Sequence, residues 1–103
     1  MKHFDSEYEK FLELWGIKSQ MIKAVEEMSE LTKEICKSFR VGAKEKMPKS
    51  VEEHIKEELA DVMNMSDQLA YYFGREEIEK IRQEKIDRTM GRIEKDGEKF
   101  KNY

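Results

Sequence analysis

Glycine and proline interrupt this sequence at only a few places, and the stretches between them are long. The chain of 103 residues has one proline, Pro48, and five glycines. Gly16, Gly42 and Gly74 separate stretches whose apolar residues recur every three or four positions, which is the period of a helix. No stretch alternates apolar and polar residues as a half-buried strand does. We therefore expect an all-α fold, a helical bundle of about four helices in a single domain over residues 1–103.

The breakers and two possible capping boxes define where these helices are expected to begin and end. Ser6 with Glu9, and Ser50 with Glu53, have the spacing of capping boxes and indicate helix N-termini. Gly16 and Gly74 have the position of C-terminal stops. The expected helices cover about 6–15, 17–39, 51–73 and 76–96, followed by a polar tail over about 96–103.

The balance of charged and apolar residues predicts an oligomer. Charged residues are 42% of the chain and hydrophobic residues 38%. That is typical of helices that complete their core by pairing with another copy. On the third expected helix, Leu59, Met63 and Ala70 widen the apolar arc well beyond one stripe. We therefore expect a homodimer or a homotetramer.

Charge, hydropathy and cysteine content argue against several classes of partner and location. The net charge of −3 argues against nucleic acid as a partner. No apolar run is long enough to span a bilayer and no signal peptide is evident, so no membrane partner is expected. Cys36 is the only cysteine, which leaves no internal disulfide, and its neighbours predict a buried core position. A cytoplasmic location fits these features.

Carboxylates crowd one flank of the apolar stripe on the second expected helix. The stripe consists of Ile17, Met21, Ala24, Met28, Leu31, Ile35 and Phe39. With Met28 at its centre, Glu27 and Glu34 lie about 100 to 120° to one side, and Glu30 lies slightly further round. Glu27 and Glu30 are therefore helical neighbours at the edge of the buried face.

The third expected helix carries a carboxylate inside its apolar face. With Val62 at the centre, six apolar residues of this helix fall within about 60°, namely Val51, Ile55, Leu59, Met65, Leu69 and Phe73. Glu58 falls there too. Asp61 flanks this face. A carboxylate on a buried face must be protonated, paired or bound to a metal. If the two helices pack together, Glu27, Glu30, Glu58 and Asp61 meet, and their oxygen ligands suit Mg²⁺ or Mn²⁺.

Two other interpretations of these acids stay open. In a chain with 23 acidic residues, each pair considered by itself is expected on a solvated helix face. A di-iron carboxylate bundle is the competing metal site, but it requires Glu-x-x-His pairs. His54 has Val51 three residues before it, and His3 lies in the terminal segment, so this pattern is missing.

The acidic motifs and their context resemble a known family. "EEMSE" at 26–30 followed by "EELAD" at 57–61 is similar to the E-E-x-x-E … E-x-x-D signature of the MazG-like all-α nucleoside triphosphate pyrophosphohydrolases. Dimeric dUTPases, dCTP pyrophosphatases and phosphoribosyl-ATP pyrophosphatase are relatives of that family. "WGIKSQMIKAVEEMSEL" and "EELADVMNM" resemble the segments around the two motifs. The resemblance covers roughly residues 10 to 95.

The resemblance implies a reaction and a set of metal ligands. Family members cleave a nucleoside triphosphate to the monophosphate and pyrophosphate, as dimers or tetramers. Glu27, Glu30, Glu58 and Asp61 match their Mg²⁺-binding catalytic acids. Glu26 matches the first acid of the signature, but the helical period points it away from the others. The residue that takes the proton of the attacking water is left unassigned.

A triphosphate also needs cationic partners and a base site. Lys85 and Arg92 are seven residues apart, share one face of the fourth helix and resemble the family's basic segment, so they are candidates for phosphate binding. They also fit surface residues whose stems cover apolar neighbours. Gln20 lies two turns before Glu27 on the same flank and is a candidate for a base edge. Trp15 is a candidate for stacking on the base, or a core aromatic.

Two other functions compete with a general nucleotide pyrophosphohydrolase. Phosphoribosyl-ATP pyrophosphatase fits the length, but Asp61 is followed by "VMNMS" and not by the Tyr-His pair associated with that branch. A non-catalytic helical interaction protein would carry its acids only as surface charge. The position of Glu58 inside an apolar face favours the enzyme.

Overall fold

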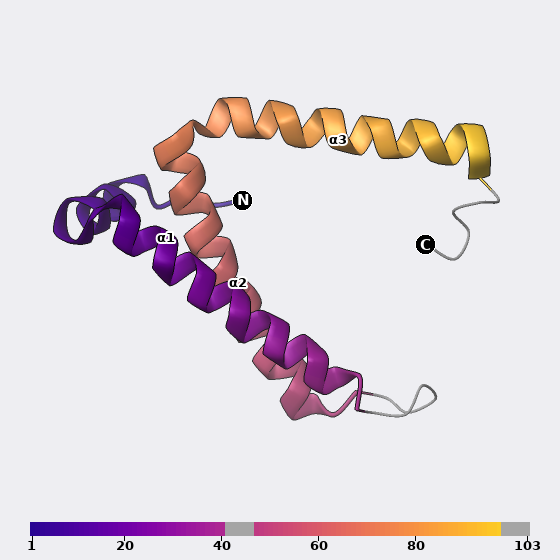
Figure 1. The fold of residues 1–103 in the computed structure, drawn as a ribbon, viewed down its shortest axis with the longest axis horizontal. Coiled ribbons are helices and arrows are strands. Elements are labelled where there is room, and N and C mark those ends of the chain that lie inside the picture. The colour runs from indigo at the N-terminus through magenta and orange to yellow at the C-terminus, as the bar shows by residue number, and fades with distance from the viewer. Residues whose placement is uncertain (41–46, 98–103) are drawn as a thin grey trace. The chain divides into compact units, whose positions relative to one another are not determined.

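The computed structural model describes residues 1–40 and 47–97, and the described part is all-α. It consists of α1 (Asp5–Ser38), α2 (Lys49–Phe73) and α3 (Arg75–Asp96) (Figure 1). No strand occurs among these residues, which confirms the expected fold class. The predicted number of four helices is not confirmed, because the segments 6–15 and 17–39 belong to one kinked helix. The expected break at Gly42 and the polar tail from residue 98 lie outside the described ranges.

Gly16 bends α1 where the sequence indicates a stop. Its φ of 79° and ψ of 159° are not helical, and this positive φ is readily adopted only by glycine. Helical geometry resumes directly after it, so the chain turns without an intervening loop. The bend separates an N-terminal segment from the long remainder of α1 (Figure 1).

The two predicted capping boxes are wrong. α1 begins at Asp5 after Phe4, which makes no side-chain cap, and Ser6 Oγ donates to Glu7 Oε2 at 3.0 Å. α2 begins at Lys49, so Ser50 lies inside its first turn. The first backbone hydrogen bonds of α2 go to Pro48 O, which accepts from the amides of Val51 and Glu52 at 3.1 Å.

The chain divides into two compact units, Met1–Tyr72 and Phe73–Tyr103. The first unit holds α1 and α2. The second holds α3, which has no buried residue, and Gly74 before it has a φ of 113°. A single domain over the whole chain therefore stays a prediction. Among the described helices, none combines the length and apolarity that crossing a bilayer requires.

A buried pair of amides fixes the register between α1 and α2. Gln68 Nε2 donates to Gln20 Oε1 at 2.8 Å. Gln68 is 1% exposed and Gln20 is 6% exposed. The helices run antiparallel. Glu27, two turns after Gln20 on α1, therefore lies opposite Asp61, two turns before Gln68 on α2. Two more turns lead to Glu34 and His54, whose Oε2 and Nδ1 atoms are 3.8 Å apart. Polar residues of the two helices thus lie opposite each other at every seventh residue.

A second polar cluster holds the N-terminal segment against α2. Asp67 is 4% exposed and accepts a hydrogen bond from the Tyr8 hydroxyl at 2.8 Å. His3 Nδ1 lies 2.9 Å from both carboxylate oxygens of Asp67. The Tyr8 ring also makes an edge contact with Phe4 and a tilted contact with Tyr71. These contacts fasten the segment before the bend at Gly16.

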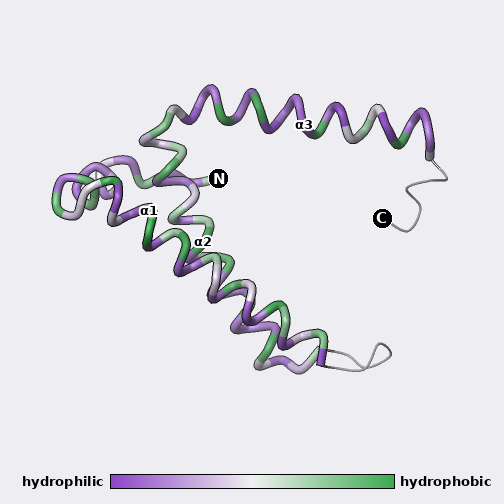
Figure 2. The backbone as a smooth tube through the Cα atoms, in the orientation of Figure 1, coloured by the Kyte–Doolittle hydropathy of each residue, from purple (hydrophilic) through white to green (hydrophobic). Residues whose placement is uncertain are grey.

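The buried face of α1 is rotated from the predicted stripe. The residues with low exposure alternate at three and four positions: Ile17, Gln20, Ala24, Glu27, Leu31 and Glu34. Met28, the predicted centre, is 44% exposed, and Phe39 is 76% exposed. Met21, Ile35 and Cys36 are exposed as well. The prediction assumed an apolar seam, whereas every second residue of this low-exposure set is polar. Figure 2 shows hydrophilic and hydrophobic residues alternating along α1.

Candidate functional site

The register of α1 and α2 brings three of the four predicted acids together. Glu27, Glu58 and Asp61 each offer a carboxylate oxygen, and these three oxygens lie within 4.8 Å of one another. Glu27 and Glu58 are half-buried, and Asp61 is exposed. Glu58 and Asp61 share one face of α2 because they are three residues apart. The cluster therefore joins two helices and is open to solvent at Asp61.

Glu58 has a carboxyl group that is crowded by like charges and partly removed from water. Burial raises the pKa of its carboxyl above the ordinary value, and the negative charges of Asp61, Glu27, Glu30 and Glu34 raise this pKa further. Its Oε2 atom is buried and has no hydrogen-bond partner among the described residues. A buried oxygen without a donor, beside two other carboxylates, fits a hard divalent cation such as Mg²⁺ or Mn²⁺.

Asp61 and Glu27 are coupled to each other and to a lysine. Partial desolvation of the carboxyl raises the pKa of Asp61, although the residue as a whole is exposed. The charge of Glu27 and a hydrogen bond with it act in the same direction, while Lys23 lowers this pKa. Lys23 Nζ lies 3.2 Å from Glu27 Oε1. This contact is the main reason that the pKa of Lys23 is raised. A positive charge therefore already lies next to the carboxylates.

The fourth predicted acid, Glu30, is exposed and does not belong to the group of three. It is close enough for its charge to raise the pKa of Glu58. A neighbouring acid that was not predicted as part of the site, Glu34, is 8% exposed and accepts from Lys37 Nζ at 3.1 Å. Its position seven residues after Glu27 was the available signal. The wheel centred on Met28 placed Glu34 on the same flank as Glu27, outside the face expected to be buried.

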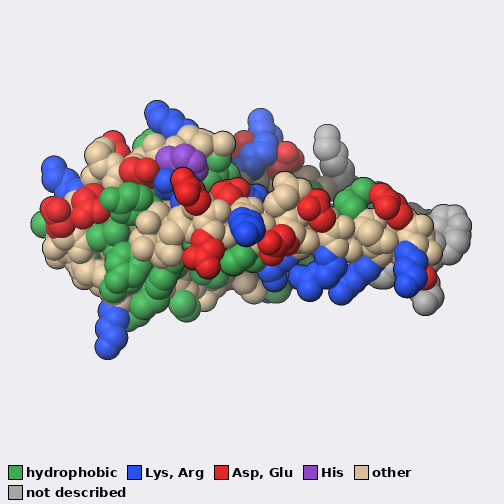
Figure 3. All heavy atoms as spheres, turned by 90° about the horizontal axis from the view of Figure 1, so that it is seen from above, with side chains coloured by type: hydrophobic (Ala, Val, Ile, Leu, Met, Phe, Trp, Pro, Cys, Tyr) green, Lys and Arg blue, Asp and Glu red, His purple; other side chains and the backbone are tan. Residues whose placement is uncertain are grey.

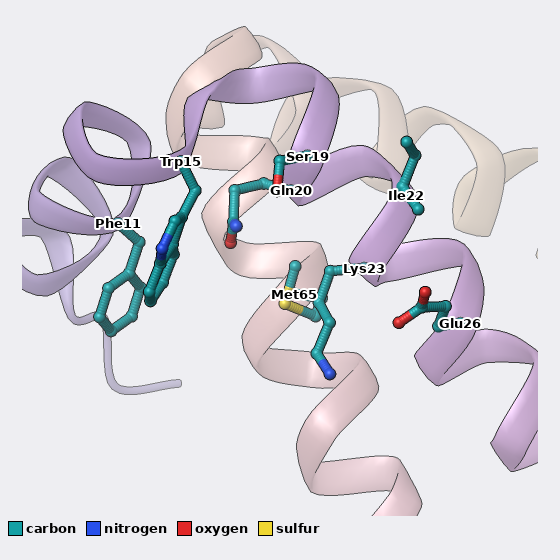
Figure 4. Close-up of a pocket in the computed structure, with 8 residues that line it drawn as sticks. All are labelled: Phe11, Trp15, Ser19, Gln20, Ile22, Lys23, Glu26 and Met65. Carbon is teal, nitrogen blue, oxygen red and sulfur yellow. The ribbon is translucent and has the colours of Figure 1, made fainter.

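Beside the cluster lies a pocket of about 560 Å³, formed where α1 bends and packs on α2 (Figure 4). Both predicted base-binding residues, Trp15 and Gln20, line it. The Trp15 ring stacks on Phe11 with centroids 5.5 Å apart, yet the residue is 57% exposed, so it is not a core aromatic. The complete lining is Phe11, Trp15, Ser19, Gln20, Ile22, Lys23, Glu26 and Met65.

The remaining predicted residues have different positions. Glu26 is exposed and lines the pocket, as its displacement from the other acids around the helix predicts. Lys85 and Arg92 are exposed on α3, which belongs to the other unit.

The raised pKa values predict a pH dependence of stability in the metal-free chain. A carboxyl whose pKa is raised by folding stabilises the fold below its ordinary pKa, and this contribution is lost as the pH rises through the folded value. Glu58→Gln removes this loss of stability, because the amide does not ionise. It also removes a negative charge beside Asp61. In chelator, we expect the free energy of unfolding of the variant to exceed that of the native chain by an amount that grows from about pH 4 to about pH 7.

Urea unfolding followed by circular dichroism at several pH values measures this difference. Glu53→Gln, at an exposed position of α2, is the matched control and should follow the native chain. A difference between Glu58→Gln and the native chain that does not change with pH would contradict carboxylate crowding.

Comparison of the chain with models of protein families, with curated proteins and with solved structures gives no match.

Proposed function

We propose that this chain is a Mg²⁺-dependent nucleoside triphosphate pyrophosphohydrolase, which cleaves its substrate to the nucleoside monophosphate and pyrophosphate. The observation that carries the proposal is the group Glu27, Glu58 and Asp61, in which the buried Glu58 Oε2 has no hydrogen-bond partner among the described residues. The resemblance of "EEMSE" and "EELAD" to the MazG-like signature supports it, since it falls on these same residues.

In the proposed reaction, the carboxylates of α1 and α2 hold the metal between them. Glu27, Glu58 and Asp61 are the ligands nearest one another, and Glu30 completes the set on the exposed side. Bound Mg²⁺ supplies a Lewis acid for the phosphoryl oxygens and a means of lowering the pKa of water. The protein's own contribution is to keep the ligand oxygens together at the cost of their mutual repulsion.

The pocket is proposed to hold the nucleobase. Trp15 offers a partly exposed aromatic face for stacking, and Phe11 supports its ring from the other side. Gln20 offers an amide for a base edge, oriented by its hydrogen bond with Gln68. Lys85 and Arg92 are kept as proposed phosphate ligands from α3. The implied compartment is the reducing cytoplasm, where the exposed Cys36 stays a free thiol.

A non-catalytic interaction protein is the second candidate, favoured by the number of exposed apolar side chains. Ile22 and Val25 on α1 are each 61% exposed, and Met63 on α2 is 49% exposed. Such a protein would bind neither Mg²⁺ nor nucleotide. It gives no reason for a half-buried Glu58 beside two acids, so the enzyme is preferred.

We expect metal-dependent release of pyrophosphate from at least one member of a panel of ribo- and deoxynucleoside triphosphates, with the monophosphate as co-product. Glu58→Gln keeps the shape of the side chain but removes a ligand charge, and should lower this rate by about 100-fold or more. Glu53→Gln should change it less than about twofold. Release of pyrophosphate that persists in chelator, or equal rates for the two variants, would contradict the proposal.

We further propose that the active form is a homodimer or a larger homo-oligomer. Among the described apolar residues only Tyr8 and Ala24 are buried, so the first unit buries little of its apolar surface by itself. Leu59 and Met63, four residues apart on one face of α2, are 42% and 49% exposed. Apolar side chains also lie among the charged ones on the face drawn in Figure 3. A second copy would cover such surface.

Light scattering at micromolar concentration should give at least twice the mass of one chain. Met63→Glu places a charge in the proposed interface and should shift the mass toward the monomer, whereas Glu53→Gln should not. A native chain that is monomeric under these conditions would contradict the proposed oligomer.

A further inference from the structure

Lys23 lies between the pocket and the carboxylates and contacts both. Its Nζ atom is 3.2 Å from Glu27 Oε1, and its side chain lines the pocket with Trp15 and Gln20 (Figure 4). The side chain is 54% exposed, so its ammonium group is accessible to a ligand and to solvent. Among the residues that line this pocket, Lys23 is the one with a positive charge.

The order of chemical groups along α1 follows from the helical spacing. Gln20, Lys23 and Glu27 are at positions i, i+3 and i+7, which lie on one face. With a rise of 1.5 Å per residue, Gln20 and Glu27 are about 10.5 Å apart along the axis, and Lys23 lies between them. The face therefore presents an amide, then an ammonium group and then the carboxylates, with the Trp15 ring at the amide end.

The ammonium group and a divalent cation compete for the same atom. Glu27 Oε1 is the oxygen that Lys23 contacts, and Glu27 is one of the three clustered acids. Lys23 also interacts with the charges of Glu26 and Asp61. A divalent cation on Glu27 would repel the ammonium group and release it from this contact. The flexible four-carbon stem then allows the group to turn toward the pocket.

We propose that Lys23 is a cation with two positions. Without metal it is the counter-ion of Glu27, and once a divalent cation occupies the carboxylates it binds the phosphate of the ligand in the pocket. The inference rests on the proposed function and adds a specificity-determining residue to it. The favoured ligand is an anion that joins a flat aromatic ring to phosphate, with the ring at Trp15 and the phosphate at Lys23.

Two binding measurements on the full chain test this inference. The first is the affinity for Mg²⁺ alone, by calorimetry. The second is the affinity, in saturating Mg²⁺, for the α,β-imido analogues of the four common deoxynucleoside triphosphates, which bind without cleavage at that bond. The variants are Lys23→Met, Lys23→Arg and the control Lys18→Met. Lys18 is exposed, and at nine residues from Glu27 it lies on the opposite side of α1.

Opposite changes in the two affinities are expected for Lys23→Met. Mg²⁺ should bind about threefold more tightly or better, because a competing charge is lost. The analogue that the native chain binds should bind about tenfold more weakly, because a charged phosphate contact is lost. Lys23→Arg should keep the affinity for the analogue within about threefold. Lys18→Met should change neither affinity by more than about twofold.

The outcomes separate this inference from the proposed function. If Lys23 only stabilises the helix, Lys23→Met should lower the melting temperature and the Mg²⁺ affinity together, and this result overturns the inference. Analogue affinity that is equal in Lys23→Met and Lys18→Met also overturns it, while native binding of Mg²⁺ and analogue leaves the proposed function standing. A native chain that binds neither Mg²⁺ nor any analogue overturns both.

Discussion

The hydrogen bond between Gln20 and Gln68 is the interaction on which the rest of the first unit depends. Two amides buried between antiparallel helices can form a hydrogen bond only when they are opposite, so they select one register of α1 on α2. That register places Glu27 opposite Asp61, two turns away. A slip of one turn along either helix would leave both amides without partners and would separate the carboxylates.

The same register brings carboxylates together, and their repulsion destabilises the fold until a ligand neutralises it. Desolvation and like charges raise the pKa of Glu58 and Asp61, so the metal-free cluster opposes folding at neutral pH. The ion pair of Lys23 with Glu27 offsets part of this repulsion. Destabilising groups at the junction of two helices are common at functional sites, where a ligand supplies the missing charge. The bend at Gly16 adds a pocket beside them, with Trp15 on its rim.

Sequence periodicity predicted the helical class and the meeting of Glu27, Glu58 and Asp61, because a carboxylate inside an apolar face is visible on one helix alone. It also selected Trp15 and Gln20, which line one pocket. The rotation of the buried face of α1 was not predictable in this way. A helical wheel assigns burial to apolar residues, whereas here Gln20 and Glu34 are buried by partners that come from the other helix.

The segment before Gly16 shows the same limit. Helical geometry is interrupted at Gly16, as its pattern of a helix stop indicates, but where the segment before it packs depends on contacts of Tyr8 and His3 with Asp67. These contacts join residues 59 and 64 positions apart, and no local pattern announces them. Cys36, expected in the core, is exposed for a related reason, since the buried seam passes through Glu34 instead.

The central claim is that Glu27, Glu58 and Asp61 bind one divalent cation between α1 and α2. Crystals grown at neutral pH and soaked in Mn²⁺ test it most directly, through anomalous diffraction. We expect a single strong anomalous peak at coordination distance, about 2.2 Å, from oxygens of all three carboxylates. No peak at this cluster, or a peak bound only to acids elsewhere on the surface, would contradict the account.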